Sequence, residues 1–368
     1  MKAGPQGVAC AMPYENLFCD HPKHSCLPPS GQIAIRAVAK ALSGKSVLPK
    51  PKAKRISLEL LAQAFSQLAP EIITRAEPEI RAIAGIWPLW WYSCDHTKMA
   101  DKKGFARKIQ ELDANPELAM LYLFHGDGRL RQEALSRLSS EMMSPFLFAA
   151  ISTRLNDWAP PVRLEAEACM TRICTPDTFT KITPAIPYLC LQIKTWLRWE
   201  ETRAAYDQIE ASPEVAAFMA RHLRVERRGK LARQLLSLLR NPAMDIHLPL
   251  LASQAATPAI RTIAYVTLLK GQAVWPIGKK RKWVDKVYGI SVKEPVCEQR
   301  SISITVNLLE LALEGAQDRS VFVRREVAYW LLTSNMDAPE VAQILSQDKY
   351  PSIRRIISFY QRKQAENA

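Results

Sequence analysis

The chain of 368 residues is predicted to be all-α, a right-handed solenoid of stacked helical hairpins that follows an irregular basic N-terminal segment. Two observations predict this class. A short motif that opens a helix occurs five times along the chain, and self-similarity at a period of a few tens of residues is typical of stacked repeats. Apolar residues stand three positions after the Arg of each copy, and in four of the five copies an apolar residue seven positions after the Arg continues the same helical stripe.

The motif places an Asp six residues before an Arg that opens an apolar stretch. Three copies are complete, with Asp and Arg at 157 and 163, 318 and 324, and 348 and 354. Arg131 belongs to a shortened copy that begins at Asp127, and Arg261 belongs to a copy with Ala255 in the Asp position. The arginines are separated by 32, 98, 63 and 30 residues, which we interpret as one, three, two and one units, with Arg233 marking a degenerate copy.

Each position of the motif has a physical role. An Asp before a helix caps its first amide groups, and a Pro in the first turn loses no helical hydrogen bond. The small or aliphatic residue three positions after the Arg lets a second helix approach closely. We expect the Arg to lie at the seam between repeats, where its planar guanidinium pairs with the Asp of its own or a neighbouring repeat.

This Asp…Val-Arg…Ala pattern resembles the signature of HEAT repeats, the helix–turn–helix units of alpha-solenoids. The resemblance covers roughly residues 105–363 and implies a fold but little chemistry, because solenoids serve as binding surfaces for many purposes. We therefore divide the chain into a basic, Pro-rich, irregular segment (1–55), an N-terminal helical cap (56–104), a repeat array (105–363) with an insertion at 271–300, and a tail (364–368).

The N-terminal third departs from the repeat pattern. Residues 32–42 are predicted to be helical, and residues 46–55 to be an extended linker because of their paired prolines. Helices are expected at 57–68 and 70–86, followed by an aromatic cluster at 88–92 that would close the end of the core. From there, the first helix of the array is expected at 105–124.

One cluster in this region has the side chains that zinc prefers. Cys19, His21, His24 and Cys26 stand within eight residues. A single short loop must wrap tightly to supply four tetrahedral ligands, so an irregular tail is favoured over a structural zinc site. We therefore predict no metal.

The composition predicts a folded, basic protein of the cytoplasm. The net charge is +14, and residues 1–56 contribute half of it. The other cations gather in three clusters, at 221–233, 279–282 and 349–363, and clustered positive charge attracts polyanions. No apolar run reaches the roughly 18 residues of a membrane span, so we expect no membrane partner. The eight cysteines stand mostly in apolar helical stretches, which is typical of free thiols in a reducing compartment.

The insertion contains the strongest candidate binding residues. Lys279, Lys280, Arg281 and Lys282 are consecutive, so one face of a helix or strand cannot bury all four, and Pro276 and Gly278 before them predict a projecting loop. Trp275 and Trp283 flank this run. Indoles beside cations suit nucleic acid, because a base can stack next to a phosphate contact. The alternative is that both indoles pin the insertion onto the solenoid, and it is favoured.

The sequence contains no Gly-x-Ser-x-Gly elbow, phosphate-binding glycine loop or His-Glu-x-x-His motif, and no cofactor is predicted. We therefore expect a non-catalytic scaffold that binds an acidic protein or nucleic acid. The expected binding residues are the insertion cations and tryptophans named above together with Arg224, Arg227 and Arg228.

A second hypothesis is a nucleic-acid-processing enzyme resembling the HEAT-like alkylpurine DNA glycosylases, which bind DNA in a basic concave groove lined with Trp and an acid. No stretch matches that family's motif. A HEAT protein of the phycobilin-lyase type has only the fold in its favour. The glycosylase hypothesis requires the basic clusters and the insertion to converge on one concave surface with a carboxylate at its centre.

Overall fold

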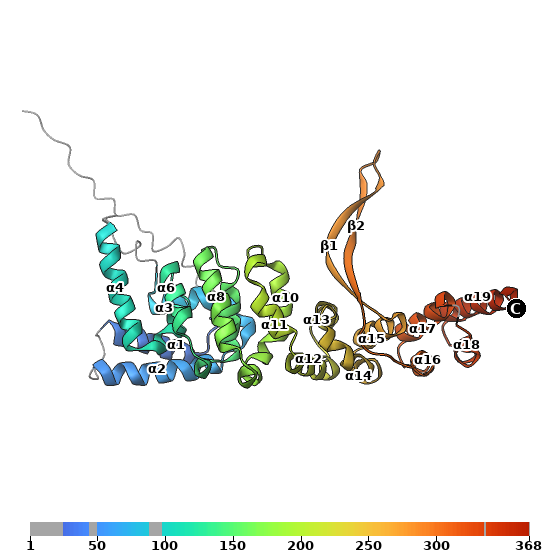
Figure 1. Cartoon of the computed structure of the whole chain (residues 1–368), viewed down its shortest axis with the longest axis horizontal. Helices are drawn as coiled ribbons and strands as arrows, with labels where there is room; N and C mark the ends of the chain where they lie inside the picture. Colours follow the sequence, from blue (N-terminus) through green and yellow to red (C-terminus); the bar gives the residue numbers. More distant parts are fainter. Residues whose placement is uncertain (1–24, 44–49, 88–97, 335, 368) are drawn as a thin grey trace, which may run out of the picture.

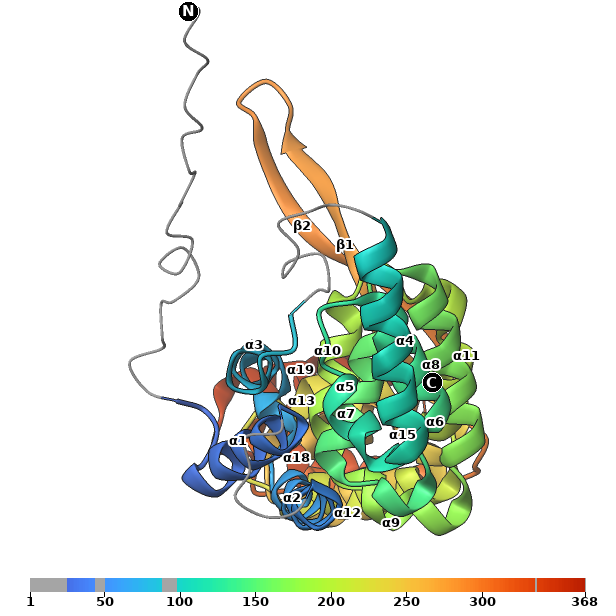
Figure 2. The ribbon, with the colours of Figure 1, turned by 90° about the vertical axis from the view of Figure 1, so that its left-hand side faces the viewer.

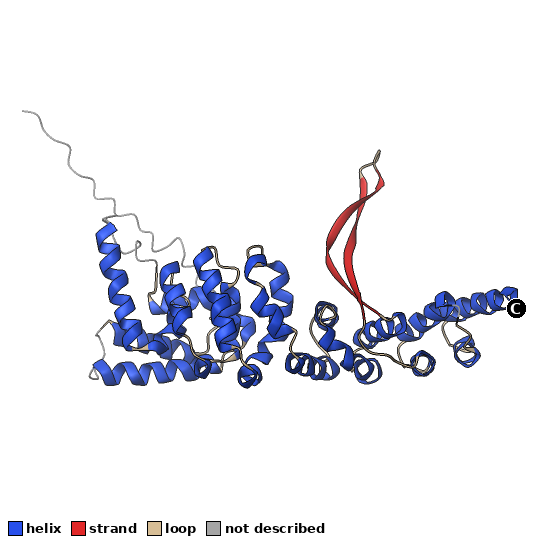
Figure 3. Cartoon of the chain, in the orientation of Figure 1, coloured by secondary structure: helices blue, strands red, loops and turns tan. Residues whose placement is uncertain are grey.

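The computed structural model describes residues 25–43, 50–87, 98–334 and 336–367. Helices dominate these residues and succeed one another along the long axis of the molecule, from α1 at one end to α19 at the other (Figure 1). In the described part of the chain, the only strands form one antiparallel hairpin (Figure 3). The protein is therefore mostly helical, as predicted, with a small sheet that was not.

The N-terminal helices are α1 (Pro29–Leu42), α2 (Lys50–Ser66), α3 (Ile73–Ala84), α4 (Lys98–Ala114), α5 (Ala119–Tyr122) and α6 (Gly128–Arg137). Two predictions here were wrong. Residues 50–55 belong to α2 rather than to an extended linker, because Pro51 falls in the first helical turn, where its missing N–H costs nothing. The helix predicted at 105–124 is broken at Asn115, before Pro116. The aromatic cluster at 88–92 lies outside the described residues.

The remaining helices are α7 (Pro145–Arg154), α8 (Pro160–Ile173), α9 (Phe179–Ile182), α10 (Ile186–Gln192), α11 (Ala204–Glu210), α12 (Pro213–Val225), α13 (Leu231–Leu238), α14 (Leu248–Gln254), α15 (Pro258–Lys270), α16 (Leu308–Ala316), α17 (Val321–Ser334), α18 (Pro339–Ser346) and α19 (Pro351–Asn367). Short 3-10 turns join several of them. Proline begins many of these helices, since its fixed φ suits the first turn.

Helices that begin with the motif stack on one another. Helix α6 packs on α8, α15 packs on α17, and α17 packs on α19. Helices α15, α17 and α19 also pack on the helices that precede them in the chain, α14, α16 and α18 respectively. The residue three positions after the Arg is fully buried in every copy, as predicted: Ala134, Ala166, Ala264, Val327 and Ile357. A continuous apolar core results, running through the described helices.

Each of the five motif arginines makes the same type of hydrogen bond. Each donates Nη1 to the backbone carbonyl six residues earlier: Arg131 to His125 (2.9 Å), Arg163 to Asp157 (3.0 Å), Arg261 to Ala255 (2.8 Å), Arg324 to Asp318 (2.8 Å) and Arg354 to Asp348 (2.6 Å). The bond closes the turn that precedes the helix. The motif's Arg is therefore bound to the main chain of its own unit.

Three of these arginines also bind the Asp of the next unit through Nε and Nη2. The closest N–O distances are 2.7 Å for Arg131–Asp157, 2.8 Å for Arg261–Asp318 and 2.5 Å for Arg324–Asp348. Each Asp also accepts the N–H two residues ahead, at 3.0, 2.6 and 2.8 Å respectively. Each carboxylate thus accepts a backbone hydrogen bond at the start of its own helix and neutralises the guanidinium of the preceding unit. The Asp–Arg pairing is therefore between neighbouring units.

Two arginines lack this second contact. The carboxylate nearest Arg163 is that of Glu201, at 3.9 Å and largely exposed, and Arg163 Nε is buried without a hydrogen-bond partner. Arg354 makes the carbonyl bond but no ion pair among the described residues. Arg233, predicted to mark a degenerate copy, is exposed and does not take the seam position.

The interval between Arg261 and Arg324 had been interpreted as two units, and the structure contradicts this. Arg261 pairs directly with Asp318, 57 residues ahead, whereas the other two pairs span 26 and 24 residues. The segment from Gln272 to Ser301 forms the hairpin, and its removal brings the separation into the same range as the others. The interval is therefore one unit that carries a hairpin.

Candidate binding site on the projecting hairpin

The insertion is a two-stranded antiparallel ribbon of β1 (Gln272–Asp285) and β2 (Ile290–Ser301). Gly271 ends α15 at φ 65°, and its carbonyl accepts the N–H of Ile302 at 3.1 Å. The chain therefore leaves and rejoins the helical body at one point. Figures 1 and 2 show the ribbon standing out beyond the helices.

The projecting loop predicted for Lys279–Lys282 is thus a strand. Pro276 and Gly278 favoured a loop, but the ribbon accommodates them through a register shift between these two residues, a bulge that contains Ile277. A two-stranded ribbon also consists of edge strands only, where proline is tolerated. The expectation that these cations face solvent is confirmed, since all four are exposed.

An ion pair between a half-buried Arg and a buried Asp holds the base of the ribbon. Arg300 donates from Nη2 and Nη1 to the two carboxylate oxygens of Asp245, at 2.6 and 2.8 Å, and Asp245 is fully buried. Ser303 adds its N–H and hydroxyl to the same carboxylate, at 2.7 and 3.0 Å. Burial alone would raise the pKa of Asp245, but these hydrogen bonds hold it below its usual value. Sequence reasoning missed this pair, because its members stand 55 residues apart.

The two tryptophans have different environments. Trp275, near the base, packs against the apolar core, as the pinning interpretation expects. Trp283 lies far along β1 and is 45% exposed, with the Arg281 guanidinium 5.4 Å from its ring centroid. Trp283 therefore does not pin the insertion and remains available to a partner.

The strand register divides the outer ribbon into two unlike faces. Cross-strand partners share a face, and successive residues of a strand alternate between faces. Lys279 is opposite Pro295, Arg281 opposite Lys293, and Trp283 opposite Ser291. We call the side formed by Lys279, Arg281, Trp283 and Lys293 the cationic face. It carries no acidic residue.

The opposite face carries charges of both signs. Lys280 is opposite Glu294, and Lys282 Nζ contacts Glu294 Oε1 at 2.6 Å. The hydrogen bond and charge of Glu294 raise the pKa of Lys282. We call the side that contains Lys280, Lys282 and Glu294 the mixed face. The consecutive cations thus do not act as one patch, because the ribbon separates them.

The other predicted binding residues belong to a different part of the molecule. Arg224 lies in the last turn of α12, and Arg227 and Arg228 are exposed in the loop before α13. Among the described residues, no hydrogen bond or ion pair joins them to the ribbon. Val225, between Arg224 and Arg227, is 63% exposed, so exposed apolar side chains accompany the cations here as well. The ribbon differs from this basic surface in that it projects from the helical body.

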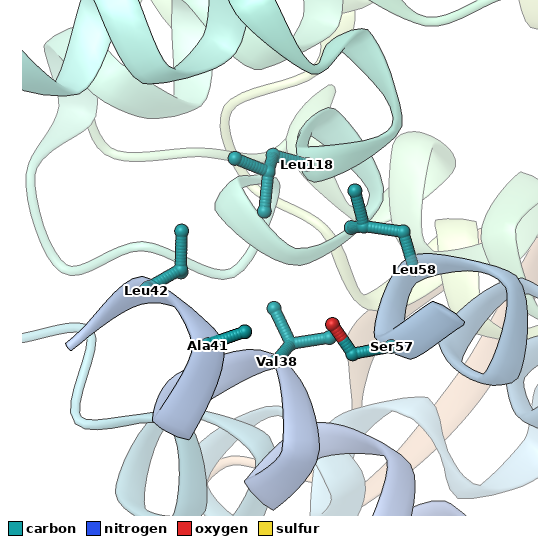
Figure 4. A pocket seen from close by; sticks show the side chains of 6 residues that line it. All are labelled: Val38, Ala41, Leu42, Ser57, Leu58 and Leu118. Carbon is teal, nitrogen blue, oxygen red and sulfur yellow. The ribbon is translucent and has the colours of Figure 1, made fainter. Parts of the chain in front are cut away.

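A small pocket near the N-terminal end does not belong to either surface. Val38, Ala41, Leu42, Ser57, Leu58 and Leu118 line it (Figure 4). These side chains carry no charge and belong to α1, α2 and the 3-10 turn before α5. The pocket therefore offers an acidic ligand nothing to pair with.

The candidate zinc cluster lies mostly outside the described residues, which include only Cys26 of its four members. Cys26 Sγ contacts Glu79 Oε2 at 3.1 Å. The described residues include no group of three or more possible metal ligands. No helix among them is long and apolar enough to cross a membrane.

No protein-family model matches this chain, and no curated protein sequence or solved structure matches it either.

Proposed function

We propose that this protein is a non-catalytic binding scaffold, a right-handed solenoid of HEAT-like repeats that presents a rigid β-hairpin to an acidic partner, either a protein or a nucleic acid. The repeated Arg–carbonyl bond and the Arg–Asp pairs between successive units support the repeat assignment. Each unit then buries its apolar face against its neighbours, as stacked repeats do.

The observation that carries the binding role is the cationic face. Lys279, Arg281 and Lys293 are exposed on one side of the ribbon without an acidic neighbour on that side. An isolated two-stranded ribbon is marginally stable in water, yet the base of this one is held by the ion pair between Arg300 and the buried Asp245. A projecting arm with uncompensated positive charge speeds the encounter with an oppositely charged surface.

No observation favours the glycosylase-type enzyme. That hypothesis needs a carboxylate at the centre of a basic concave surface. Glu294, the acid opposite Lys280, is paired with Lys282 and belongs to the projecting ribbon rather than to a concave surface. We therefore keep the scaffold as the proposed function.

The test compares three forms of the full chain as immobilised bait for an extract of the source cells. They are the wild type, a hairpin variant with Lys279, Lys280, Arg281 and Lys282 changed to Gln, and a control variant with Arg75, Lys270, Arg355 and Arg362 changed to Gln. The control positions are exposed on the helical body, so both variants lose four positive charges. We expect the hairpin variant alone to lose the bound material.

Treating half of each extract with nuclease identifies the partner class. If both variants retain the material equally, the hairpin is not the binding element. If both lose it equally, only net charge matters, and the proposed role of the ribbon is wrong. For a nucleic acid, the hairpin variant lowers the salt dependence by up to about four counterions' worth of slope.

A further inference from the structure

The tip of the ribbon presents two apolar side chains in a fixed turn. Val287 is 89% exposed and Tyr288 is 79% exposed. The Asp285 carboxylate accepts the N–H groups of both residues, at 2.8 and 3.1 Å. Gly289, at φ 67°, supplies the left-handed conformation that closes the turn. The two side chains therefore point into solvent from a preorganised backbone, not from a loose loop.

Apolar exposure continues below the tip. Val284, Ile290 and Val292 are 64%, 53% and 46% exposed, and Trp283 adds its indole on the cationic face. Several exposed apolar side chains gathered at one end of the ribbon indicate an interaction site, because exposing apolar surface to water is unfavourable. Preorganisation lowers the entropy cost of burying such a surface in a partner.

These side chains distinguish between the two classes of acidic partner. A nucleic acid offers phosphates, base edges and the faces of bases, which suit cations and aromatic rings. It offers little to Val284, Val287 and Ile290 together. A protein can surround aliphatic side chains in an apolar cleft while acidic residues at its rim face the cations. The aliphatic content of the tip therefore favours a protein.

A second copy of the chain fits the surface poorly. The chain has a net charge of +14, and the cationic face carries no acidic residue. Two ribbons that met along these faces would place like charges together. Lysines along an edge strand also oppose pairing between identical strands. Charge complementarity thus points to a different protein.

We infer that the hairpin docks onto an acidic protein, with Val287 and Tyr288 inserted into an apolar cleft and the cationic face against an acidic rim. This inference rests on the proposed function and names the partner class. The cations give attraction at a distance, and the tip gives short-range complementarity. The two contributions are separable, because they involve different residues.

The first step of the test is site-specific photo-crosslinking of the full chain in an extract of the source cells. Benzoylphenylalanine replaces Tyr288, and in a control chain it replaces Tyr329, which is 47% exposed on α17. We expect one discrete adduct from position 288, sensitive to protease and resistant to nuclease, and no such adduct from position 329. A nuclease-sensitive adduct, an adduct with a second copy of this chain, or no adduct at all would overturn the inference.

The second step uses calorimetry to measure how tightly this chain binds the partner protein, identified from the crosslinked adduct and then purified by itself. The tip variant Val287→Ser/Tyr288→Ser is expected to bind at least about tenfold more weakly with an unchanged salt dependence. The conservative variant Val287→Ile/Tyr288→Phe should bind like wild type, which separates loss of apolar contact from a distorted hairpin. Phe322→Ser/Tyr329→Ser, on the exposed side of α17, is the control.

The outcomes separate the inference from the proposed function. If the tip variant binds like wild type while the four-Gln hairpin variant binds weakly, the inference is wrong and the proposed function stands. If neither variant changes the affinity, both are wrong. If the conservative variant binds as weakly as the Ser variant, apolar contact is not what the tip provides, and the inference fails.

Discussion

Arg261 and Asp318 form a two-point ion pair across an inserted hairpin, with N–O distances of 2.8 and 3.0 Å. The pair has the same geometry as Arg131–Asp157 and Arg324–Asp348, whose members are far closer in sequence. The helical body therefore continues past the insertion point without a change in how successive units are joined. The ribbon is an addition to one unit, and no residue from 277 to 293 is buried in the core.

The seam arginines are predicted to differ in their effect on stability. In Arg324→Leu, Asp348 would keep its charge in a buried position without its guanidinium, and we expect a loss of roughly 1–3 kcal/mol. Arg163→Leu removes one hydrogen bond to a carbonyl and leaves no paired carboxylate behind, so we expect about 1 kcal/mol or less. Chemical denaturation of both variants gives the two values.

Arg354→Leu is the matched control for this comparison. Arg354 makes the same carbonyl bond as Arg163 and, like it, has no Asp from a following unit. It should therefore behave like Arg163→Leu. Equal losses in all three variants would show that the carboxylate pairs add nothing to the carbonyl bond.

Acid sensitivity is predicted to begin near neutral pH because of His125. This side chain is buried, and burial, together with the nearby Lys108, lowers its pKa to about 3 from 6.5. The unfolded chain therefore binds the proton first as the pH falls below 6.5, and the stability that neutral His125 supports is lost between that pH and 3. Between pH 7 and pH 5 the free energy of unfolding should fall by about 2 kcal/mol.

The measurement is denaturant unfolding at several pH values for wild type and His125→Asn. An Asn side chain can still accept the N–H of Asp127, which His125 Nδ1 accepts at 2.9 Å. The variant should lose most of this pH dependence, and what remains includes His247, whose pKa burial also lowers. An unchanged slope in the variant would mean that another group titrates.

Below about pH 4 a second loss is expected from the seam carboxylates. Burial opposes their charge, but hydrogen bonds from the arginines hold the pKa of Asp157 and of Asp348 below the usual 3.8. The stability that these two carboxylates contribute is fully present above the unfolded-state pKa of 3.8, and it is lost as the pH falls through their lower folded-state pKa.

The sequence contained enough information to predict the helices and the seam but not the ribbon. Asp and Arg at a fixed spacing predict a capped helix start, because the Asp and the Arg each bond backbone groups only a few residues away in the sequence. Which Asp each Arg binds depends on stacking, so Arg163 and Arg324 looked equivalent. The ribbon was missed because neither of its outer faces is buried. Without a buried face, apolar and polar residues alternate only weakly along the two strands, although Ile290 and Val292 stand two residues apart on β2.

The hairpin residues illustrate the same limit. The run Lys279–Lys282 predicted exposed charge, and the exposure of these side chains is confirmed. The division into two faces follows from the pairing of Arg281 with Lys293 and of Lys280 with Glu294, which only the register reveals. The anchoring of Arg300 by Asp245 joins distant segments and leaves no local signal.

Shortening the ribbon is predicted to leave the helical body folded. Replacing residues 276–297 by Asn-Gly joins Trp275 to Glu298, which are cross-strand partners, through a two-residue turn. The change keeps the buried Ala273, the packed Trp275 and the Arg300–Asp245 pair. We expect a helical circular dichroism signal and a melting temperature close to those of wild type. Broad or early unfolding would show that the outer ribbon supports the core.

The proposed function requires the ribbon to be the arm that binds the acidic partner. The most direct measurement is the binding of that partner to the shortened chain and to the full chain, at equal concentration and low salt. We expect the full chain to bind and the shortened chain not to bind, although both are folded. Equal binding by the two chains would contradict the proposed function.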